Sequence, residues 1–190
     1  MRIRGALLTA AVLVTGLIGA AGSAAATEKP AATTARTAAA AAAPYCGITW
    51  GSLAKSGGTL SQAPLVEART GRHTCYDRVV FEFNGAADGY AVHYGEAYTE
   101  GQGQPMSPIT AGGALLAVSL RAPAYAYGTG NHVANVTGYR TLRDVVSGGS
   151  YEGYTTFAVG VRARLPYRVF VLSGPGTHSR IVLDVAHQWQ

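Results

Sequence analysis

The chain has 190 residues, of which 48% are hydrophobic, and a formal net charge of +5. Residues 1–26 contain two of the 15 basic residues, Arg2 and Arg4, and none of the 10 acidic ones, so the remainder carries a charge of about +3. The other basic residues are spread along the chain and form no basic helix or arginine cluster, which argues against nucleic acid as a partner.

The first 26 residues have the pattern of a secretory signal peptide. Two arginines precede an apolar, uncharged run at residues 6–21, which is short for a membrane span. Ala24 and Ala26 are the small residues that a signal peptidase requires, so we expect cleavage after Ala26. The sequence therefore predicts a Sec-type signal peptide and a mature protein that is secreted, extracellular and without a membrane span, either released or associated with the cell wall.

Residues 27–44 are rich in Ala and Thr and contain no aromatic residue. A segment of this composition buries too little apolar surface to fold alone, so we expect a disordered linker. Residues 45–190 have the size of one domain. The predicted organisation is therefore a signal peptide at 1–26, a linker at 27–44 and a single domain at 45–190.

The only two cysteines, Cys46 and Cys75, both follow the predicted signal peptide. An oxidising compartment and an even count predict one disulfide between them. Closing a loop of roughly thirty residues stabilises a fold by about 3–4 kcal/mol in the chain-entropy model. The two cysteines lack the CxxC spacing of a redox or metal site.

Beyond Cys75 the sequence alternates apolar and polar residues, as a strand with one buried face does. In RVVFEF, residues 78–83, the apolar side chains of Val79, Phe81 and Phe83 are expected to share the buried face. The pattern returns as RIVLDV at residues 180–185. We interpret the two segments as framework strands, neighbours in one sheet, whose arginine and acid pair on the outer face.

The remaining sequence predicts several more short strands separated by Gly, Pro and Asn turns. They are expected at residues 90–94, 114–121, 155–165 and 167–172, with a short helical turn considered at 142–146. A total of about seven or eight short strands predicts an all-β fold, an antiparallel β-sandwich. Residues 124–136 are expected to form an irregular surface loop, long enough to suggest a functional role.

Four segments of the chain carry a family resemblance. Residues 45–52 read YCGITWGS, 69–81 read RTGRHTCYDRVVF, 160–170 read GVRARLPYRVF and 179–187 read SRIVLDVAH. Together they resemble the AMIN-like domain of actinobacterial exported proteins and lipoproteins. The resemblance implies a relative of the AMIN domain, a two-sheet β-sandwich that serves as a localisation module in cell-envelope amidases and secretin-type assemblies. It thus implies a non-catalytic domain that recognises peptidoglycan or a wall-associated partner.

No catalytic or metal-binding pattern emerges from the sequence. The histidines have no metal-ligand spacing; they are His73, His93, His132, His178 and His187. Glu82 and Asp184, at matching places in the two similar strands, are the one pair of carboxylates that suggests glycoside hydrolysis. Pairing of these acids with arginines on the sheet explains them more simply. We therefore expect no metal, no cofactor and no enzymatic activity.

The strongest binding candidates are tyrosines and arginines beside Gly-rich loops. They are Tyr94, Tyr98, Tyr125, Tyr127, Arg140, Arg143, Tyr151 and Tyr154. Tyrosine rings can stack on sugars, and arginines can pair with the peptide carboxylates of a wall polymer. Tyrosine also commonly rims a small sandwich without binding a ligand.

The leading hypothesis is an exported, non-catalytic binding module of the cell envelope that recognises peptidoglycan or another cell-wall polymer or protein. Two alternatives use the loop at residues 124–136. One is a small secreted hydrolase with His132 as its base, and the other is an inhibitor that presents this loop to a protease.

Overall fold

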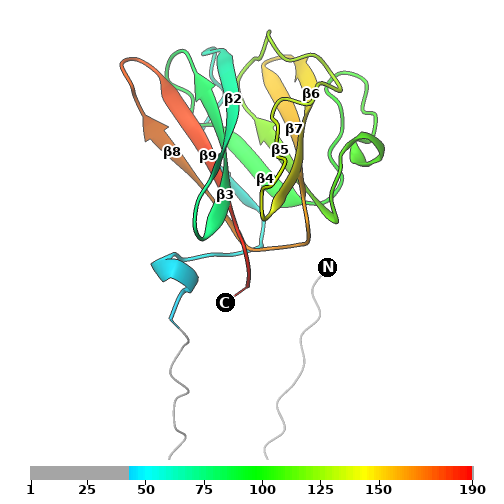
Figure 1. The fold of residues 1–190 in the computed structure, drawn as a ribbon. Helices are drawn as coiled ribbons and strands as arrows, with labels where there is room; N and C mark the ends of the chain where they lie inside the picture. The colour runs from blue at the N-terminus through cyan, green and yellow to red at the C-terminus, as the bar shows by residue number, and fades with distance from the viewer. Residues whose placement is uncertain (1–42, 190) are drawn as a thin grey trace, which may run out of the picture. The chain divides into compact units, whose positions relative to one another are not determined.

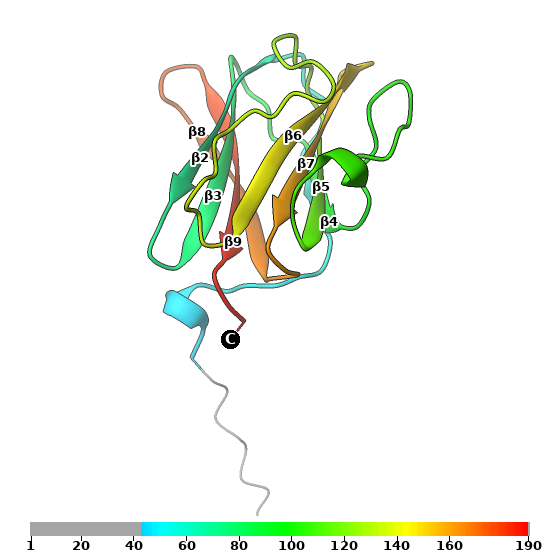
Figure 2. The same cartoon turned by 45° about the vertical axis from the view of Figure 1, so that its right-hand side comes forward.

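The structure, a computed structural model, describes residues 43–189; the predicted signal peptide and nearly all of the predicted linker lie outside these residues. Within 43–189, nine strands form two antiparallel sheets that pack face to face (Figures 1 and 2). This confirms the predicted antiparallel β-sandwich, with slightly more strands than predicted. No helix in the described range has the length and apolar character that crossing a membrane requires.

One sheet has five strands in the order β1-β4-β5-β7-β6, and the other has four in the order β2-β3-β9-β8. The strands are β1 Lys55–Gly57, β2 Leu65–Arg72, β3 Tyr76–Phe83, β4 Tyr90–Tyr94, β5 Ala114–Leu120, β6 Leu142–Tyr151, β7 Tyr154–Val161, β8 Tyr167–Ser173 and β9 Ser179–Ala186. Two short 3-10 turns, η1 Tyr45–Gly47 and η2 Ser107–Ile109, accompany them.

The two look-alike segments are neighbouring strands, as predicted. β3 and β9 pair antiparallel, with Arg78 opposite Asp184 and Glu82 opposite Arg180. The predicted apolar face of β3 is fully buried. The repeated pattern therefore reflects a shared place in one sheet, where each strand buries the apolar face of the repeat and carries its arginine and its acid on the other.

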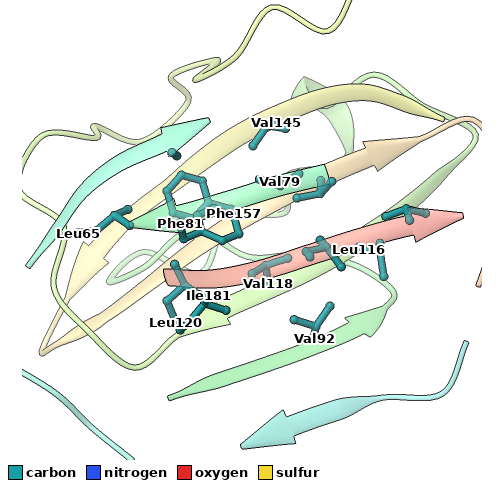
Figure 3. Packing of buried hydrophobic residues seen from close by; sticks show 14 of the residues in the cluster. Leu65, Val79, Phe81, Val92, Leu116, Val118, Leu120, Val145, Phe157 and Ile181 are labelled. Carbon is teal, nitrogen blue, oxygen red and sulfur yellow. The ribbon is translucent and has the colours of Figure 1, made fainter. Parts of the chain in front are cut away.

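The core lies between the two sheets and contains side chains from both (Figure 3). Phe81 of β3 meets Phe157 of β7 with ring centroids 4.9 Å apart. Burying such a side chain contributes about 1.5–3 kcal/mol. Tyr167 is also buried, with its hydroxyl 2.8 Å from the carbonyl oxygen of Leu53 and 2.9 Å from that of Val92. Burial raises the pKa of Tyr167 to about 12.

Residues 142–146, considered for a helical turn, are instead the beginning of β6. The pairing of β6 with β7 shifts register between Leu142 and Asp144 and again between Ser147 and Ser150. Each such bulge interrupts the two-residue alternation that marks a strand. The sequence pattern here was misleading because of these bulges.

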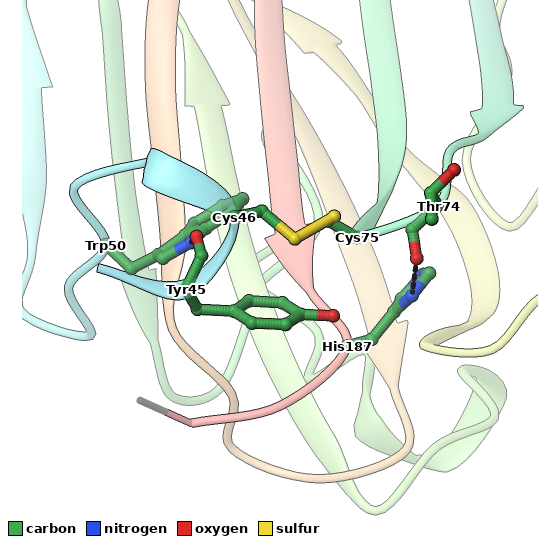
Figure 4. The surroundings of a disulfide bond; sticks show 6 residues. All are labelled: Tyr45, Cys46, Trp50, Thr74, Cys75 and His187. Atoms are coloured by element: carbon green, nitrogen blue, oxygen red, sulfur yellow. Dashed lines mark hydrogen bonds between the residues drawn. A yellow bond between two sulfur atoms is a disulfide. The ribbon is translucent and has the colours of Figure 1, made fainter. Parts of the chain in front are cut away.

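The predicted disulfide between Cys46 and Cys75 is present, with the sulfurs 2.00 Å apart (Figure 4). It ties the N-terminal segment of the domain to the residue before β3. On the C-terminal side, the backbone N–H of His187 donates to the carbonyl of Cys75 at 2.9 Å. Both ends of the domain are therefore fastened at the same place.

The outer face of the five-stranded sheet is covered by the segment between β4 and β5. Met106 of this segment is fully buried in a small apolar cluster with alanines and Val146. Glu96 holds the segment in place, since its carboxylate accepts N–H bonds from Met106 at 3.1 Å and Ser107 at 2.9 Å. Hydrogen bonding, first from the Ser107 hydroxyl, lowers the pKa of Glu96.

Candidate ligand-binding pocket

A cavity of about 470 Å³ lies between residues 132–139 and the first residues of β6. The loop that forms its wall runs along the free edge of β6 (Figure 2). Val133 donates its N–H to the carbonyl of Val145 at 2.9 Å, and Ser147 donates to Asn131 at 2.9 Å. These backbone bonds cover the edge of the sheet and hold the loop's side chains at the cavity.

A histidine and an aspartate meet at this cavity. His132 Nδ1 lies 2.8 Å from Asp144 Oδ1, and the two side chains are 60% and 9% exposed. Because a carboxylate only accepts hydrogen bonds, Nδ1 carries the proton in this contact. In the neutral ring, Nε2 is then an acceptor that remains for a ligand.

Asp144 is a structural anchor for this histidine. Its Oδ2 accepts the N–H of Ala111 at 3.1 Å, and its Oδ1 accepts the N–H of Val145 at 2.9 Å as well as the His132 contact. Both oxygens are thus engaged by the protein. The carboxylate fixes the imidazole and the neighbouring backbone, and it has little capacity left for a ligand.

Arg143 stands beside this pair with an exposed side chain. Its guanidinium donates to backbone carbonyls of Leu142 at 2.8 Å, Tyr139 at 3.2 Å and Arg140 at 3.5 Å. These acceptors are neutral, so they orient the guanidinium without neutralising its charge. The five N–H donors of an arginine exceed these three contacts, which leaves donors for an anion.

The surroundings of Arg143 add positive charge. Arg72 lies over the ring of Tyr139, with its guanidinium carbon 5.8 Å from the ring centroid, and Arg140 is exposed. The Tyr139 hydroxyl bonds the hydroxyl of Thr70 at 3.0 Å, which joins this wall of the pocket to β2. Arg143 therefore lines the pocket with Arg72 and Arg140 next to its lining residues, while the carboxylate of Asp144 is already engaged, and the pocket favours an anionic ligand.

The predicted contact residues divide among several places. Arg143 lines the pocket and Arg140 is next to it, whereas Tyr125 and Tyr151 share a separate cavity of about 340 Å³. Tyr98 lines a third cavity of about 250 Å³ beside β4. Tyr154 is exposed at the start of β7.

The other two predicted tyrosines have structural partners. The Tyr94 hydroxyl donates to the carbonyl of Leu165 at 2.6 Å and accepts its N–H at 2.9 Å. The Tyr127 hydroxyl accepts the N–H of Ala68 at 2.7 Å, and its ring packs against Phe157. Their polar groups are used inside the protein, so they are the weakest of the predicted ligand contacts.

Sequence reasoning singled out Arg143 and His132 for different hypotheses and missed Asp144 and Tyr139. The link between His132 and Asp144 depends on an isolated bridge that pairs His132 with Val146. Spacing along the chain does not reveal such a bridge. An acidic residue beside Arg143 could have drawn attention to Asp144, but the sequence does not show which side chain Asp144 contacts.

A second concentration of charge lies on the outer face of the four-stranded sheet. Asp184, whose side chain is fully buried, accepts two bonds from Arg78, at 2.6 and 2.9 Å, and one from Arg168 at 2.8 Å. Glu82 is bonded by Arg69 at 2.6 Å and by His178 at 2.7 Å. Both acids of the two similar strands are therefore paired with cations, as the simpler interpretation predicted.

Among the described residues, no group of three His, Cys, Asp or Glu side chains converges as a metal site would require. The family model described as the AMIN-like domain matches residues 63–187. A search of curated proteins gives no match. The matched range contains β2 to β9 and all of the pocket described above.

Proposed function

The chain belongs to the AMIN-like domain family, and from this premise we propose that it is an exported, non-catalytic binding module of the cell envelope. Its proposed ligand is an anionic cell-wall polymer, with the peptide carboxylates of peptidoglycan as the group that enters the pocket at residues 132–144. The observation that carries this proposal is the exposed guanidinium of Arg143, which is oriented by neutral carbonyls and lacks a carboxylate partner within residues 43–189.

The pocket suits a carboxylate because Arg143 is already oriented. A guanidinium presents its N–H groups as a flat fork that matches the two oxygens of a carboxylate. Since backbone carbonyls hold the side chain, less conformational entropy is lost when a ligand binds. The side chain of His132 is 60% exposed, and its Nε2, an acceptor in the neutral ring, can accept an N–H or O–H group of the same ligand.

Export is supported by two features of the chain. The first 26 residues have the pattern of a signal peptide. The domain also contains the Cys46–Cys75 disulfide, a bond that persists in oxidising compartments and is rare in the cytosol. Both agree with a place in the cell envelope.

The two exposed tyrosines at the separate cavity extend the proposal. Tyr125 is 83% exposed and Tyr151 is 55% exposed, and they line the same cavity of about 340 Å³. Flat, exposed aromatic faces are suited to stacking on sugar rings. We propose them as secondary contacts to the glycan of the same polymer.

Retention of the purified mature protein on insoluble peptidoglycan tests the proposal. We expect retention above that of an unrelated protein of similar charge at moderate salt. Peptidoglycan whose free carboxyl groups have been converted to amides should retain much less, because the arginine then has no anion to bind. Equal retention on both materials would contradict the carboxylate part, and no retention on either would contradict wall binding.

A secreted hydrolase is the second candidate, and one observation favours it. The contact of His132 with Asp144 at 2.8 Å orients an imidazole as in many general bases. Release of soluble fragments from peptidoglycan, abolished by His132→Ala in a protein that remains folded, would support this candidate. Activity that is the same in the wild type and His132→Ala would remove it.

A further inference from the structure

β8 is an outer strand of the four-stranded sheet, hydrogen-bonded to β9 on one side only (Figure 1). The N–H of Tyr167 donates across the other side, to the carbonyl of Gly51 at 2.8 Å. In a strand, every second residue directs its backbone groups to the same side. The outward groups of Val169 and Val171 therefore follow that of Tyr167, and within residues 43–189 they have no hydrogen-bond partner.

The other sheet edges are protected. The edge of β6 is covered by residues 130–133, and β1 is only three residues long. At the edge of β2, Leu65 donates to the carbonyl of Pro123 at 2.8 Å and Ala68 to the hydroxyl of Tyr127. Natural proteins usually blunt an open edge in such ways, because an open edge pairs with other chains.

The open part of β8 lacks these devices. Residues 169–173 read VFVLS and contain no charged residue and no proline. Val171 is 38% exposed and Leu172 is 36% exposed. An uncharged apolar strand with unpaired backbone groups is the type of edge to which another strand adds.

We propose that β8 is the interface with a second copy of this chain, which pairs antiparallel across a two-fold axis at Val171. In this register Val171 lies opposite the partner's Val171, and the outward backbone groups of both strands meet. Phe170 lies opposite the partner's Leu172, so apolar side chains meet on the outer face. Arg168 lies opposite the partner's Gly174, so no like charges are brought together.

A cavity beside β8 gives the added strand a place for its side chains. Val171 and Ser173 line a cavity of about 350 Å³ together with Leu60 and Asp88, which belong to the loops after β1 and β3. Residues directly opposite each other in a sheet share one face. The partner's Val171 therefore lies on the same face as Val171, beside this cavity. A two-fold pairing satisfies both open edges at once and closes the assembly at a dimer.

Cysteine cross-linking tests this register. The two cysteines of the chain are bonded to each other, so Val171→Cys introduces the sole free thiol. At a two-fold axis the two introduced cysteines have Cα atoms about 5.5 Å apart, within reach of a disulfide. We expect mild oxidation of the mature protein to give a covalent dimer. The matched control is Val66→Cys, an exposed position on β2, which should stay monomeric on a reducing-agent-free gel.

Molar mass by light scattering tests the pairing without a cross-link. The wild type should show a rise of about twofold in molar mass with concentration, and Val171→Pro should remain monomeric. Proline is tolerated here because the lost N–H faces the open edge and serves no bond to β9. The circular dichroism spectrum of the variant should match the wild type.

A wild type that stays monomeric at every concentration would overturn the proposal, as would equal cross-linking at Val171 and Val66. Binding of an added extended peptide to a monomeric wild type, blocked by Val171→Pro, would also overturn it, since the edge would then serve a different occupant. If Val171→Pro fails to fold, Val171→Lys replaces it with the same expected loss of the dimer.

Discussion

The protein has two concentrations of charge that differ in what the charges contact. On the outer face of the four-stranded sheet, Asp184 is bonded by Arg78 and Arg168, and Glu82 is bonded by Arg69 and His178. In the pocket, Arg143 donates to neutral carbonyls and the ring of His132 is 60% exposed. Side chains that form ion pairs with one another stabilise the fold. A charged side chain that is oriented by neutral groups remains available to a ligand.

Aromatic contacts reinforce this difference. The guanidinium of Arg168 lies 5.5 Å from the ring of Trp50 and 5.0 Å from that of Phe170. That of Arg78 lies 5.2 Å from the ring of Tyr76. The sheet therefore holds its arginines by carboxylates and by rings at once. If the two regions differ as their contacts imply, substitutions in the sheet should mainly lower stability and substitutions in the pocket should mainly weaken ligand binding.

Asp184→Asn should cause the largest loss of stability. The change removes the negative charge between Arg78 and Arg168 and leaves two partly buried cations without a counter-charge. Breaking a buried ion pair in this way costs about 3–5 kcal/mol. Urea unfolding followed by tryptophan fluorescence measures the effect. The matched control is Glu67→Gln, an exposed pair with Arg69, which should cost less than about 1 kcal/mol. Similar losses in both variants would contradict this account.

Asp144→Ala should cost less, about 1–3 kcal/mol, because it leaves the N–H groups of Ala111 and Val145 without their acceptor. It also frees the imidazole of His132, so wall binding should weaken in the protein that remains folded. The same urea experiment, followed by a peptidoglycan pull-down, measures both effects. A variant with wild-type stability would show that the carboxylate is not the anchor of the pocket.

The ionisation of Glu82 should make the stability of the protein depend on pH. The pKa of Glu82 is lowered, first by its hydrogen bond with His178 and then by that with Arg69. A carboxyl group with a lowered folded-state pKa stabilises the protein above its unfolded value, about 4.3, and loses this contribution as the pH falls through the folded pKa. The stability difference between the wild type and Glu82→Gln should therefore shrink as the pH falls below about 4.3 and through the lower folded-state pKa. Urea midpoints at each pH check this; a constant difference would contradict it.

His132→Ala should have the smallest effect on stability, within about 0.5 kcal/mol, because the side chain is largely exposed and Asp144 retains its two backbone donors. Its effect should appear in ligand binding instead. Differential scanning calorimetry and a pull-down on peptidoglycan measure the two properties on one preparation. A loss of unfolding free energy above about 1 kcal/mol would show that His132 mainly stabilises the fold, which contradicts a role in ligand binding alone.

The architecture was largely predictable from the sequence. Strands such as β3 bury one face, so their residues alternate, and the similar pattern of β9 predicted a neighbour with opposite charges. The edge strand β2 and the bulged strand β6 were not predicted. β2 has exposed residues at Val66 and Glu67 next to a register shift, so its alternation is as weak as that of β6.

The pocket was predictable only in part. Arg143 was a candidate because arginine beside a loop suits a wall polymer, and His132 was a candidate because of the loop that contains it. What joined them was the pairing of the loop with the edge of β6, which brings His132 to Asp144. A contact of this kind depends on how the loop pairs with β6, and this pairing cannot be predicted from the alternation of apolar and polar residues.

The central claim is that an anionic wall polymer binds at the guanidinium of Arg143. Its most direct test is a binding isotherm of the mature protein on purified peptidoglycan at fixed, moderate salt, comparing the wild type with Arg143→Ala and with Arg164→Ala, an exposed arginine away from the pocket. We predict that Arg143→Ala weakens binding by about tenfold to a hundredfold, as expected for the loss of hydrogen bonds to a charged group, while Arg164→Ala binds as the wild type does. Equal affinities for all three proteins would contradict the claim.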